Sequence, residues 1–352
     1  MGDVDVAVIG SGQSGLATAH ALLRKGLRPV VLEASERTAG SWPRYYDSLT
    51  LFSPARYSSL PGMAFPGGDP DRYPHRDEVI AYLTAYAARL DADIRTHSHV
   101  TAVHADGPGF VLDLKGGSRL AARAVVAASG TFGRPHRPEL PGLEQFTGTV
   151  LHAAGYRRPQ PFAGQRVIVV GAGNSAVQIA AELAPTAQVT LTSRHPVKFA
   201  RPRILGRDLH FWLKRTGIDT VPLGRLLRTP PTQLVIDDGR YRDAVAAGAP
   251  DRRELFTAIE GGKVTWPDGS TEEADTILLA TGYRPDLPYL ARLGALDDTG
   301  HPLHRDGVSS VHPGLTFAGL EWQRSLASNS LRGVGRDATR IARRLSIHLS
   351  RT

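Results

Sequence analysis

The chain has 352 residues, 41% of them hydrophobic, which is enough for two domains with a core each. It contains no cysteine, which excludes disulfide scaffolds, thiolate metal sites and redox-active cysteine pairs, so any redox chemistry must come from a bound cofactor. The formal charge is +8, but the basic residues are mostly scattered arginines without a nucleic-acid motif, so we expect anionic cofactors rather than nucleic acid as partners.

Nothing in the sequence points to a membrane or to a metal. No apolar run approaches the roughly 18 residues that span a bilayer, and the chain enters its first predicted strand without a charged and apolar leader. We therefore expect a cytoplasmic protein that binds no membrane and holds no metal.

Residues 4–33 read as strand, glycine turn, helix and strand. An apolar run at 4–9 is followed at once by the G-x-G-x-x-G pattern of residues 10–15, and apolar residues then recur with helical spacing. A second apolar run, 29–32, ends in Glu33, close to the spacing expected for a ribose-binding acid. This combination predicts a dinucleotide-binding βαβ unit, whereas a βαβ unit without a ligand would not need all these features together.

Each glycine of this turn has a physical role. Gly10 permits the tight turn, Gly12 lets the backbone approach a pyrophosphate, and Gly15 lets helix and strand pack closely. The helix start offers unpaired N–H groups and the positive end of its dipole to the phosphates. Glu33 supplies an acceptor for a ribose hydroxyl.

A long irregular stretch follows at 34–76. A loop of this length inside a domain is usually functional. It is rich in aromatic residues, and we expect it to fold over a flat apolar ligand with Trp42, Leu51 and Phe52 as walls. The alternative is a surface loop whose aromatic residues fill a gap in the core.

The first predicted domain continues to a proline-rich linker. Asp77 is expected to cap a helix reaching about residue 90, and short antiparallel strands follow between 93 and 120. A buried strand at 124–128 leads into Ser129 and Gly130, and the prolines of 134–142 mark the linker.

A second nucleotide-binding pattern begins at residue 166. The apolar run 167–170 is followed by a glycine turn at 171–176, with Ala176 in the third place, and by a helix. The next predicted strand ends in Ser193 and Arg194, where an acid would select NAD. Because an arginine pairs with a 2'-phosphate, this unit is predicted to bind NADPH.

The rest of the chain closes both units. Residues 195–249 give mixed signals and no role, apart from a short helix near 208–214. A buried strand at 276–280 is followed by Thr281 and Gly282. A last strand at 315–319 precedes an amphipathic helix reaching residue 347, which we expect to pack on the first domain.

Between the two glycine turns lies F-x-G-x-x-x-H-x-x-x-Y, formed by Phe146, Gly148, His152 and Tyr156. With it the chain resembles the class B flavin-containing monooxygenases, since both fingerprints, this motif and an A-T-G-Y segment at 280–283 occur in the family's order. The segments 51–55, 58–62 and 73–79 are similar to the CzcO-like bacterial branch, near arsenic-resistance and YUCCA-type enzymes.

The resemblance implies an α/β fold of two Rossmann-like domains of the three-layer β/β/α type. Residues 1–155 and 281–352 would form a discontinuous FAD-binding domain, and residues 156–280 an inserted NADPH-binding domain. Proline-rich linkers would let the nicotinamide swing over the flavin.

The resemblance also implies which residues contact each cofactor. Expected FAD contacts are Gly10, Gly12, Gln13, Ser14, Gly15, Glu33, Gly40, Ser41, Trp42, Leu51, Val100, Ser129, Gly130 and Leu326. Expected NADPH contacts are Gly171, Gly173, Asn174, Ser175, Ala176, Ser193, Arg194, Thr281 and Gly282. No side chain is assigned as a catalytic acid or base: His152, Phe146 and Tyr156 are interpreted as hinge residues, while Arg56, Tyr57 and Arg203 are candidates to face the substrate.

The implied function is an NADPH-dependent flavin monooxygenase that forms a peroxyflavin and transfers one oxygen atom to nitrogen, sulfur, arsenic or carbon of a small molecule. Its partners would be that substrate and dioxygen, and a homodimer is compatible with the family. Two alternatives stay open: an FAD-containing NADPH oxidoreductase that passes electrons to a quinone or a protein, and an inactive flavin-binding regulatory protein. Tyr156 stands where family members that form esters from ketones usually have tryptophan, which makes that reaction less expected here. Animal members of the family are expected to carry an asparagine in the segment aligned with Phe52 and Ser53, and this chain has none nearby.

Overall fold

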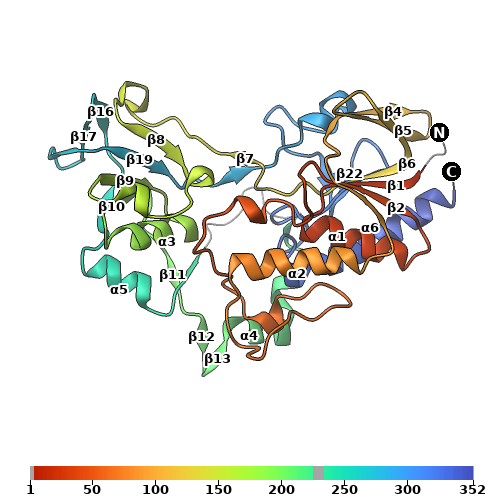
Figure 1. The fold of residues 1–352 in the computed structure, drawn as a ribbon, viewed down its shortest axis with the longest axis horizontal. Coiled ribbons are helices and arrows are strands. Elements are labelled where there is room, and N and C mark those ends of the chain that lie inside the picture. The colour runs from red at the N-terminus through yellow and green to blue at the C-terminus, as the bar shows by residue number, and fades with distance from the viewer. Residues whose placement is uncertain (1–3, 225–233, 352) are drawn as a thin grey trace.

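Two β-sheets, one in each half of the molecule, organise the chain (Figure 1). The computed structural model describes residues 4–224 and 234–351. We call the half that contains the N-terminal strand the first unit, and the half formed by the middle of the chain the inserted unit.

The first unit is built on a nine-stranded sheet with the order β21-β22-β23-β6-β1-β2-β3, and β4 and β5 continue from β6. Strands β23, β6, β1, β2 and β3 run parallel, whereas β4, β5 and the first half of β6 form an antiparallel meander. The strands are β1 (Val4–Ile9), β2 (Pro29–Leu32), β3 (Asp93–Arg95), β4 (Val100–Asp106), β5 (Gly109–Leu114), β6 (Arg119–Ala127), β21 (His304–Arg305), β22 (Val308–Ser309) and β23 (Leu315–Phe317).

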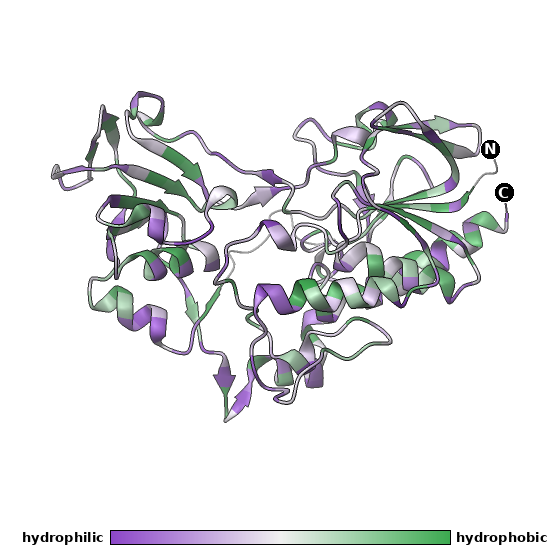
Figure 2. Cartoon of the chain, in the orientation of Figure 1, coloured by the Kyte–Doolittle hydropathy of each residue, from purple (hydrophilic) through white to green (hydrophobic). Residues whose placement is uncertain are grey.

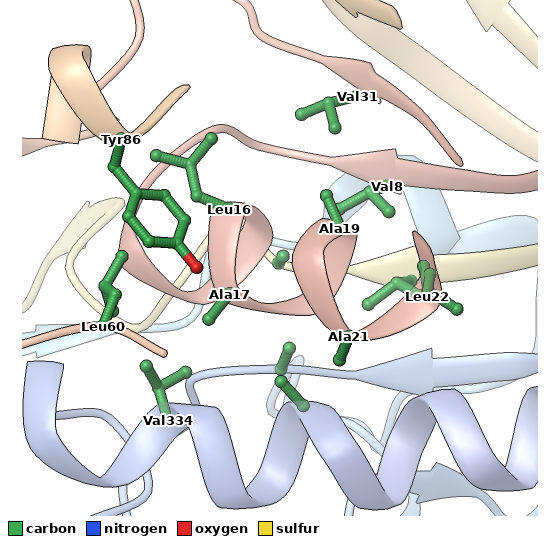
Figure 3. Packing of buried hydrophobic residues seen from close by; sticks show 14 of the residues in the cluster. Val8, Leu16, Ala17, Ala19, Ala21, Leu22, Val31, Leu60, Tyr86 and Val334 are labelled. Atoms are coloured by element: carbon green, nitrogen blue, oxygen red, sulfur yellow. The ribbon is translucent and has the colours of Figure 1, made fainter. Parts of the chain in front are cut away.

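Helices cover one face of this sheet and the meander covers the other. In Figure 3, α1 lies between β1 and α6, with Val8 and Val31 on one side and Val334 on the other. The opposite face packs against Leu112 of the meander and Leu290. The helices of this unit are α1 (Gln13–Leu23), α2 (Arg76–Ala88), α6 (Leu331–Leu349) and the short 3-10 helices η1 (Trp42–Arg44), η2 (Ala55–Tyr57) and η8 (Pro288–Leu293). The predicted β/β/α layering is confirmed.

The inserted unit repeats this design on a parallel five-stranded sheet, β15-β10-β9-β19-β8. Helices pack on one face and a small antiparallel sheet on the other, so the strands are apolar on both sides (Figure 2). The elements are β8 (Thr149–His152), β9 (Arg166–Val170), β10 (Gln188–Ser193), β15 (Asp251–Glu254), β19 (Thr276–Leu279), β16 (Ala258–Glu260), β17 (Lys263–Thr265), β18 (Thr271–Glu273), α3 (Asn174–Leu183), α5 (Arg240–Ala246), η3 (Leu143–Gln145), η4 (Ala153–Gly155) and η5 (Gln160–Phe162).

The two chain crossings between the units pair with each other. Outgoing β7 (Arg134–Pro135) and returning β20 (Tyr283–Arg284) form a two-stranded antiparallel sheet, drawn between the halves in Figure 1. Strand β8 pairs with β19, so the inserted sheet takes in residues before position 155. The division at 155/156 and 280/281 stays a prediction.

A segment of the inserted unit reaches back onto the first unit, and we call residues 199–224 the docking arm. Tyr73 donates to Asp208 at 2.6 Å, Arg332 pairs with Asp219 at 2.9 Å, and Gly224 N–H donates to the Arg324 carbonyl oxygen. Residues 225–233 are not described. The elements in and beside the arm are β11 (Phe199–Ala200), β12 (Arg203–Ile204), β13 (Arg207–Asp208), α4 (Leu209–Thr216), η6 (Ile218–Thr220) and β14 (Val235–Ile236).

The predicted start of the helix near residue 77 was wrong by a short distance. Helix α2 begins at Arg76 with His75 as its N-cap, and the His75 N–H donates to Glu78 at 2.8 Å. Asp77 lies inside the first turn, where its negative charge interacts favourably with the positive end of the helix dipole but does not cap the helix.

Candidate functional site

The first glycine turn has the geometry that its pattern predicts. Gly10 has a φ of 102°, and a Cβ there would lie 2.8 Å from the Ala128 carbonyl oxygen. A Cβ on Gly15 would overlap the carbonyl oxygen of Gly10. Gly12 and Gly40 face each other, because a Cβ on Gly40 would lie 2.8 Å from the Gly12 Cα. The turn therefore tolerates no side chain at Gly10 or Gly15.

Helix α1 begins at Gln13, inside this glycine pattern, and has no side-chain cap. Gly12 occupies the N-cap position without a side-chain hydrogen bond, and the first turn contains no acidic residue. The first helical bond runs from the Leu16 N–H to the Gly12 carbonyl oxygen at 3.0 Å. The N–H groups of the first turn and the positive end of the dipole are thus available to an anion.

Glu33 lies at the end of β2, 6% exposed, and accepts four hydrogen bonds. The N–H and hydroxyl of Ser11 donate to one carboxylate oxygen at 2.9 and 2.7 Å, and those of Ser35 donate to the other at the same two distances. Burial by itself raises the pKa of Glu33, but the hydrogen bonds from Ser35 and Ser11 outweigh it and lower that pKa. Glu33 is therefore an ionised carboxylate at neutral pH.

Gln13 ties the turn to two distant segments. Its side-chain oxygen accepts from the Trp42 indole at 2.8 Å, and its side-chain nitrogen donates to the Asn329 carbonyl oxygen at 3.2 Å. Ser14 is buried against Gly319, where a Cβ would overlap its hydroxyl. These contacts bring segments far apart in the sequence to the start of α1.

The remaining residues predicted to contact FAD are spread more widely. Ser129 follows β6 and shares a 2.8 Å hydrogen bond with Tyr289, while Leu51 borders the core beneath α1. Val100 is buried in β4 within the meander-side core, and Leu326 is 46% exposed. Next to Gly130, the buried Thr131 hydroxyl has no hydrogen-bond partner among the described residues.

A series of aromatic rings that the sequence reasoning missed joins the two units. Ring centroids are 5.5 Å apart for Trp42 and Tyr45, 6.2 Å for Tyr45 and Phe132, 5.6 Å for Phe132 and Tyr283, and 5.0 Å for Tyr283 and His152. Each successive pair meets nearly edge to face, an arrangement that aromatic rings favour. In the sequence, these aromatic residues stand beside predicted cofactor contacts, and that position could have indicated the series.

The second glycine turn reproduces the first. A Cβ on Gly171, whose φ is 151°, would overlap the Ala280 carbonyl oxygen, while Ala176 is fully buried. Gly173 is the uncapped N-cap of α3, with no acid in the first turn. Asn174 accepts from the Ile236 N–H at 3.3 Å and donates to the Leu234 carbonyl oxygen at 3.4 Å. Ser175 follows it in the first turn of α3.

Ser193 and Arg194 stand at the end of β10, near this turn. Ser193 is buried and its hydroxyl donates to the His195 carbonyl oxygen at 2.7 Å. Arg194 is exposed and makes no ion pair with a described residue. Its guanidinium group is therefore available to an anionic ligand.

The F-x-G-x-x-x-H-x-x-x-Y motif lies where the chain enters the inserted unit. A Cβ on Gly148 would meet the Phe146 ring at 2.5 Å. The His152 Nδ1 accepts from the Ala154 N–H at 3.0 Å, so Nε2 carries the proton and donates to Gly282 at 3.1 Å. Burial lowers the pKa of His152, which keeps the ring neutral. The histidine thus joins the outgoing chain to the returning one.

Tyr156 completes the motif beneath α3. It is fully buried, and its hydroxyl donates to Glu182 at 2.8 Å. Beside Gly282 in the returning chain, the Thr281 hydroxyl donates to the His136 carbonyl oxygen at 2.5 Å. Both contacts bind parts of the inserted unit or its linkers to one another.

The described residues show neither a candidate metal centre nor a helix that could span a membrane. Residues 4–224 and 234–351 contain no group of three or more histidine, aspartate or glutamate side chains placed to hold a metal ion. Within the same ranges no helix has the length and apolar character needed to cross a bilayer.

Comparison with known proteins gives a consistent set of relatives. Residues 7–214 match the family described as pyridine nucleotide-disulphide oxidoreductase. The chain is 33% identical to an oxidoreductase named CzcO-like from Geobacillus kaustophilus, over 95% of this chain and 96% of that protein. It is 31% identical to indole-3-pyruvate monooxygenase YUCCA1 from Oryza sativa, over 96% and 90%. The solved flavin-containing monooxygenase from Stenotrophomonas maltophilia superposes with a TM-score of 0.86 at 32% identity, covering 99% of both chains.

Proposed function

This chain belongs to the pyridine nucleotide-disulphide oxidoreductase family, among its flavin-dependent monooxygenases, and from that premise we propose that it is an NADPH-dependent monooxygenase that forms a peroxyflavin. One oxygen atom of dioxygen would pass to a small-molecule nucleophile. The family resemblance and the enzyme class predicted from the sequence are confirmed, while the cofactor contacts and the substrate belong to the proposal. The observation that carries it is the pair of glycine turns, each leading into an uncapped helix.

The first unit fits FAD. The uncapped start of α1 would hold the pyrophosphate. Because neither Gly12 nor the adjacent Gly40 has a side chain, a ligand can approach the backbone at this point. The buried Thr131 hydroxyl, just beyond the end of β6, has no partner in the described part of the chain and would be available to the cofactor. Because Glu33 already accepts four hydrogen bonds, a ribose hydroxyl would take the place of one serine hydroxyl.

The inserted unit fits NADPH. Gly171 and Gly173 leave the start of α3 open to a second pyrophosphate, and Arg194 stands free to pair with a 2'-phosphate. The chain's own residues then have structural tasks. His152 holds the returning strand at Gly282, and the aromatic series from Trp42 to Tyr283 joins the two units beside the expected cofactor contacts.

The cofactors would supply the redox chemistry, namely hydride transfer from NADPH to FAD and activation of dioxygen on the reduced ring. No nucleophilic side chain is needed for this reaction. The neutral His152, hydrogen-bonded through both ring nitrogens to backbone, has no free proton acceptor, which supports a positioning role rather than a general-base role.

The replacement Arg194→Ala should weaken NADPH binding by about tenfold to a hundredfold, because a charge-assisted hydrogen bond contributes about 1.5–3 kcal/mol. NADH binding should change little, since NADH lacks the 2'-phosphate. Isothermal titration of the flavin-loaded protein with the oxidised forms NADP⁺ and NAD⁺, which differ in the same 2'-phosphate, tests this difference. Arg343→Ala, which removes an exposed arginine of α6, is the matched control. Equal losses for the two nucleotides would remove Arg194 from the site.

The proposed reaction itself is tested by stopped-flow spectroscopy. The FAD-loaded protein is reduced with NADPH without oxygen, mixed with oxygenated buffer and followed over the flavin absorbance bands. We expect a long-lived oxygenated flavin spectrum and slow release of peroxide in the absence of substrate. Immediate reoxidation with stoichiometric peroxide would support the reductase alternative, and failure to bind FAD or to accept hydride would support the regulatory one.

A further inference from the structure

An open pocket of about 490 Å³ lies where the first unit meets the docking arm. One wall is η2, which lies within the irregular stretch 34–76 of the first unit, and the other is α4 of the arm. Figure 1 shows α4 beside the orange loop below α2. The lining residues are Arg56, Tyr57, Phe211, Lys214 and Arg215. Arg203, the third residue predicted to face a substrate, is exposed in β12 and does not line this pocket.

The charge in this pocket is positive and partly uncompensated. Arg56 is bound to Asp71, with both nitrogen–oxygen distances at 2.9 Å. Lys214 and Arg215, in the last turn of α4, make no ion pair with any residue of the described ranges. Among the described residues no acidic side chain lines the pocket. A ligand with a negative charge would therefore find two cations without a carboxylate partner, Lys214 and Arg215.

Two aromatic rings stand in the same pocket, and neighbouring groups hold each of them. Tyr57 stacks on the His210 ring with centroids 6.2 Å apart and has the Lys214 ammonium nitrogen 5.8 Å from its ring centre. Phe211 meets Trp212 edge to face at 5.1 Å, and the Arg207 guanidinium group lies 5.4 Å from its ring centre. Ordered rings offer apolar contact at a low entropic cost.

The two walls are fastened together next to the pocket. The Asp208 carboxylate accepts from the Tyr73 hydroxyl at 2.6 Å and contacts His210 Nδ1 at 2.8 Å. His210 is only 2% exposed, so this bridge is buried under the ring of Tyr57. The pocket is therefore formed by the fold itself and does not depend on a ligand to bring its walls together.

We propose that this pocket binds a small aromatic molecule that carries a negative charge. Its ring would lie against Tyr57 and Phe211, and its carboxylate or equivalent anion would contact Lys214 and Arg215. A neutral aromatic molecule lacks the partner for the cations, and a non-aromatic anion lacks the partner for the rings. The proposal rests on this geometry and is independent of the proposed oxygenation.

Phenylacetate is a suitable probe, with phenylacetamide as its neutral isostere and cyclohexylacetate as its non-aromatic one. Binding is measured by isothermal titration and saturation-transfer NMR on the flavin-loaded full chain. We expect phenylacetate to bind up to about fivefold more tightly than phenylacetamide, because one exposed charge contact contributes up to about 1 kcal/mol. We also expect it to bind more tightly than cyclohexylacetate, which keeps the charge but lacks the aromatic ring. Equal binding of phenylacetate and phenylacetamide would overturn the proposal.

The double variant Lys214→Gln/Arg215→Gln should lower phenylacetate affinity by at least about fivefold, and Phe211→Leu should lower it while leaving the charge in place. Lys115→Gln/Arg343→Gln removes one exposed lysine and one exposed arginine elsewhere and should change nothing. A loss in this control as large as in the pocket variant would overturn the assignment, as would displacement of phenylacetate by saturating NADP⁺.

A turnover assay distinguishes two roles for such a ligand, substrate and effector. If the bound acid is a substrate, NADPH and oxygen will convert it to an oxygenated product. If it is an effector, the rate of NADPH consumption will change without such a product. Either result accompanies binding and supports the pocket, whereas absence of binding at millimolar phenylacetate overturns it even where the stopped-flow test of the oxygenase succeeds.

Discussion

Replacing Gly15 with alanine is expected to abolish FAD retention and to lower the free energy of unfolding by about 1–3 kcal/mol. The new methyl group would overlap the Gly10 carbonyl oxygen and lie 3.5 Å from Val8 Cγ1, so α1 would have to move away from β1. That movement displaces the helix start that would hold the pyrophosphate. The measurements are the absorbance of the purified protein, titration with FAD and thermal unfolding.

Gly68→Ala is the matched control for this prediction. Gly68 is exposed, and a Cβ there would meet nothing within 4 Å. This variant should bind FAD as the parent does. If Gly15→Ala folds and takes up FAD with the parent's affinity, the first glycine turn is not the cofactor site.

The largest expected loss of stability follows from Asp337→Ala. Asp337 and Arg324 form an ion pair at 2.6 Å, with side chains 3% and 8% exposed. Arg324 also donates to the Thr220 carbonyl oxygen at 3.0 Å, so the pair joins α6 to the docking arm. Removing the carboxylate leaves a buried guanidinium group without its partner, which should lower the free energy of unfolding by about 3–5 kcal/mol. Chemical denaturation and calorimetry of the whole chain measure this loss.

Two further variants show whether burial of the charge causes the loss. Arg324→Met/Asp337→Leu replaces both charges by apolar groups and should be less destabilised than Asp337→Ala, since no unpaired charge remains. Glu273→Ala breaks the exposed pair with Lys263, whose side chains are 67% and 53% exposed, and should cost at most about 1 kcal/mol. A double variant less stable than Asp337→Ala would contradict the electrostatic explanation.

The two nucleotide-binding units were predictable because their patterns are local. A strand of apolar residues, a turn that only glycine permits and a helix with apolar spacing occur within about 30 residues, and each follows from short-range sterics. The structure accordingly shows β1 and α1, and then β9 and α3, close to the predicted positions. The helix cap at Asp77 was misplaced because the neighbouring polar residues His75 and Asp77, two positions apart, compete for one N-cap position.

The short helix predicted near 208–214 is present as α4 (Leu209–Thr216), but the rest of the docking arm was not predictable from its own residues. Its strands are two residues long, and its one full helix, α4, has eight residues, so periodicity carries little signal there. Its structure depends on partners more than a hundred positions away, such as Tyr73 for Asp208 and Arg332 for Asp219. Buried polar residues need such partners, and the pattern along the chain does not identify them.

The sequence by itself determined the two glycine turns, the strands and helices that flank them and the family to which the chain belongs. Only the tertiary structure decided that Glu33 is held by two serines, that the two linkers pair through β7 and β20, and that Tyr57 meets α4 across a charged pocket. The physical reason is the separation along the chain over which each kind of interaction acts. Backbone conformation and side-chain periodicity act between near neighbours, whereas hydrogen bonds, ion pairs and ring contacts join residues that only the folded chain brings together.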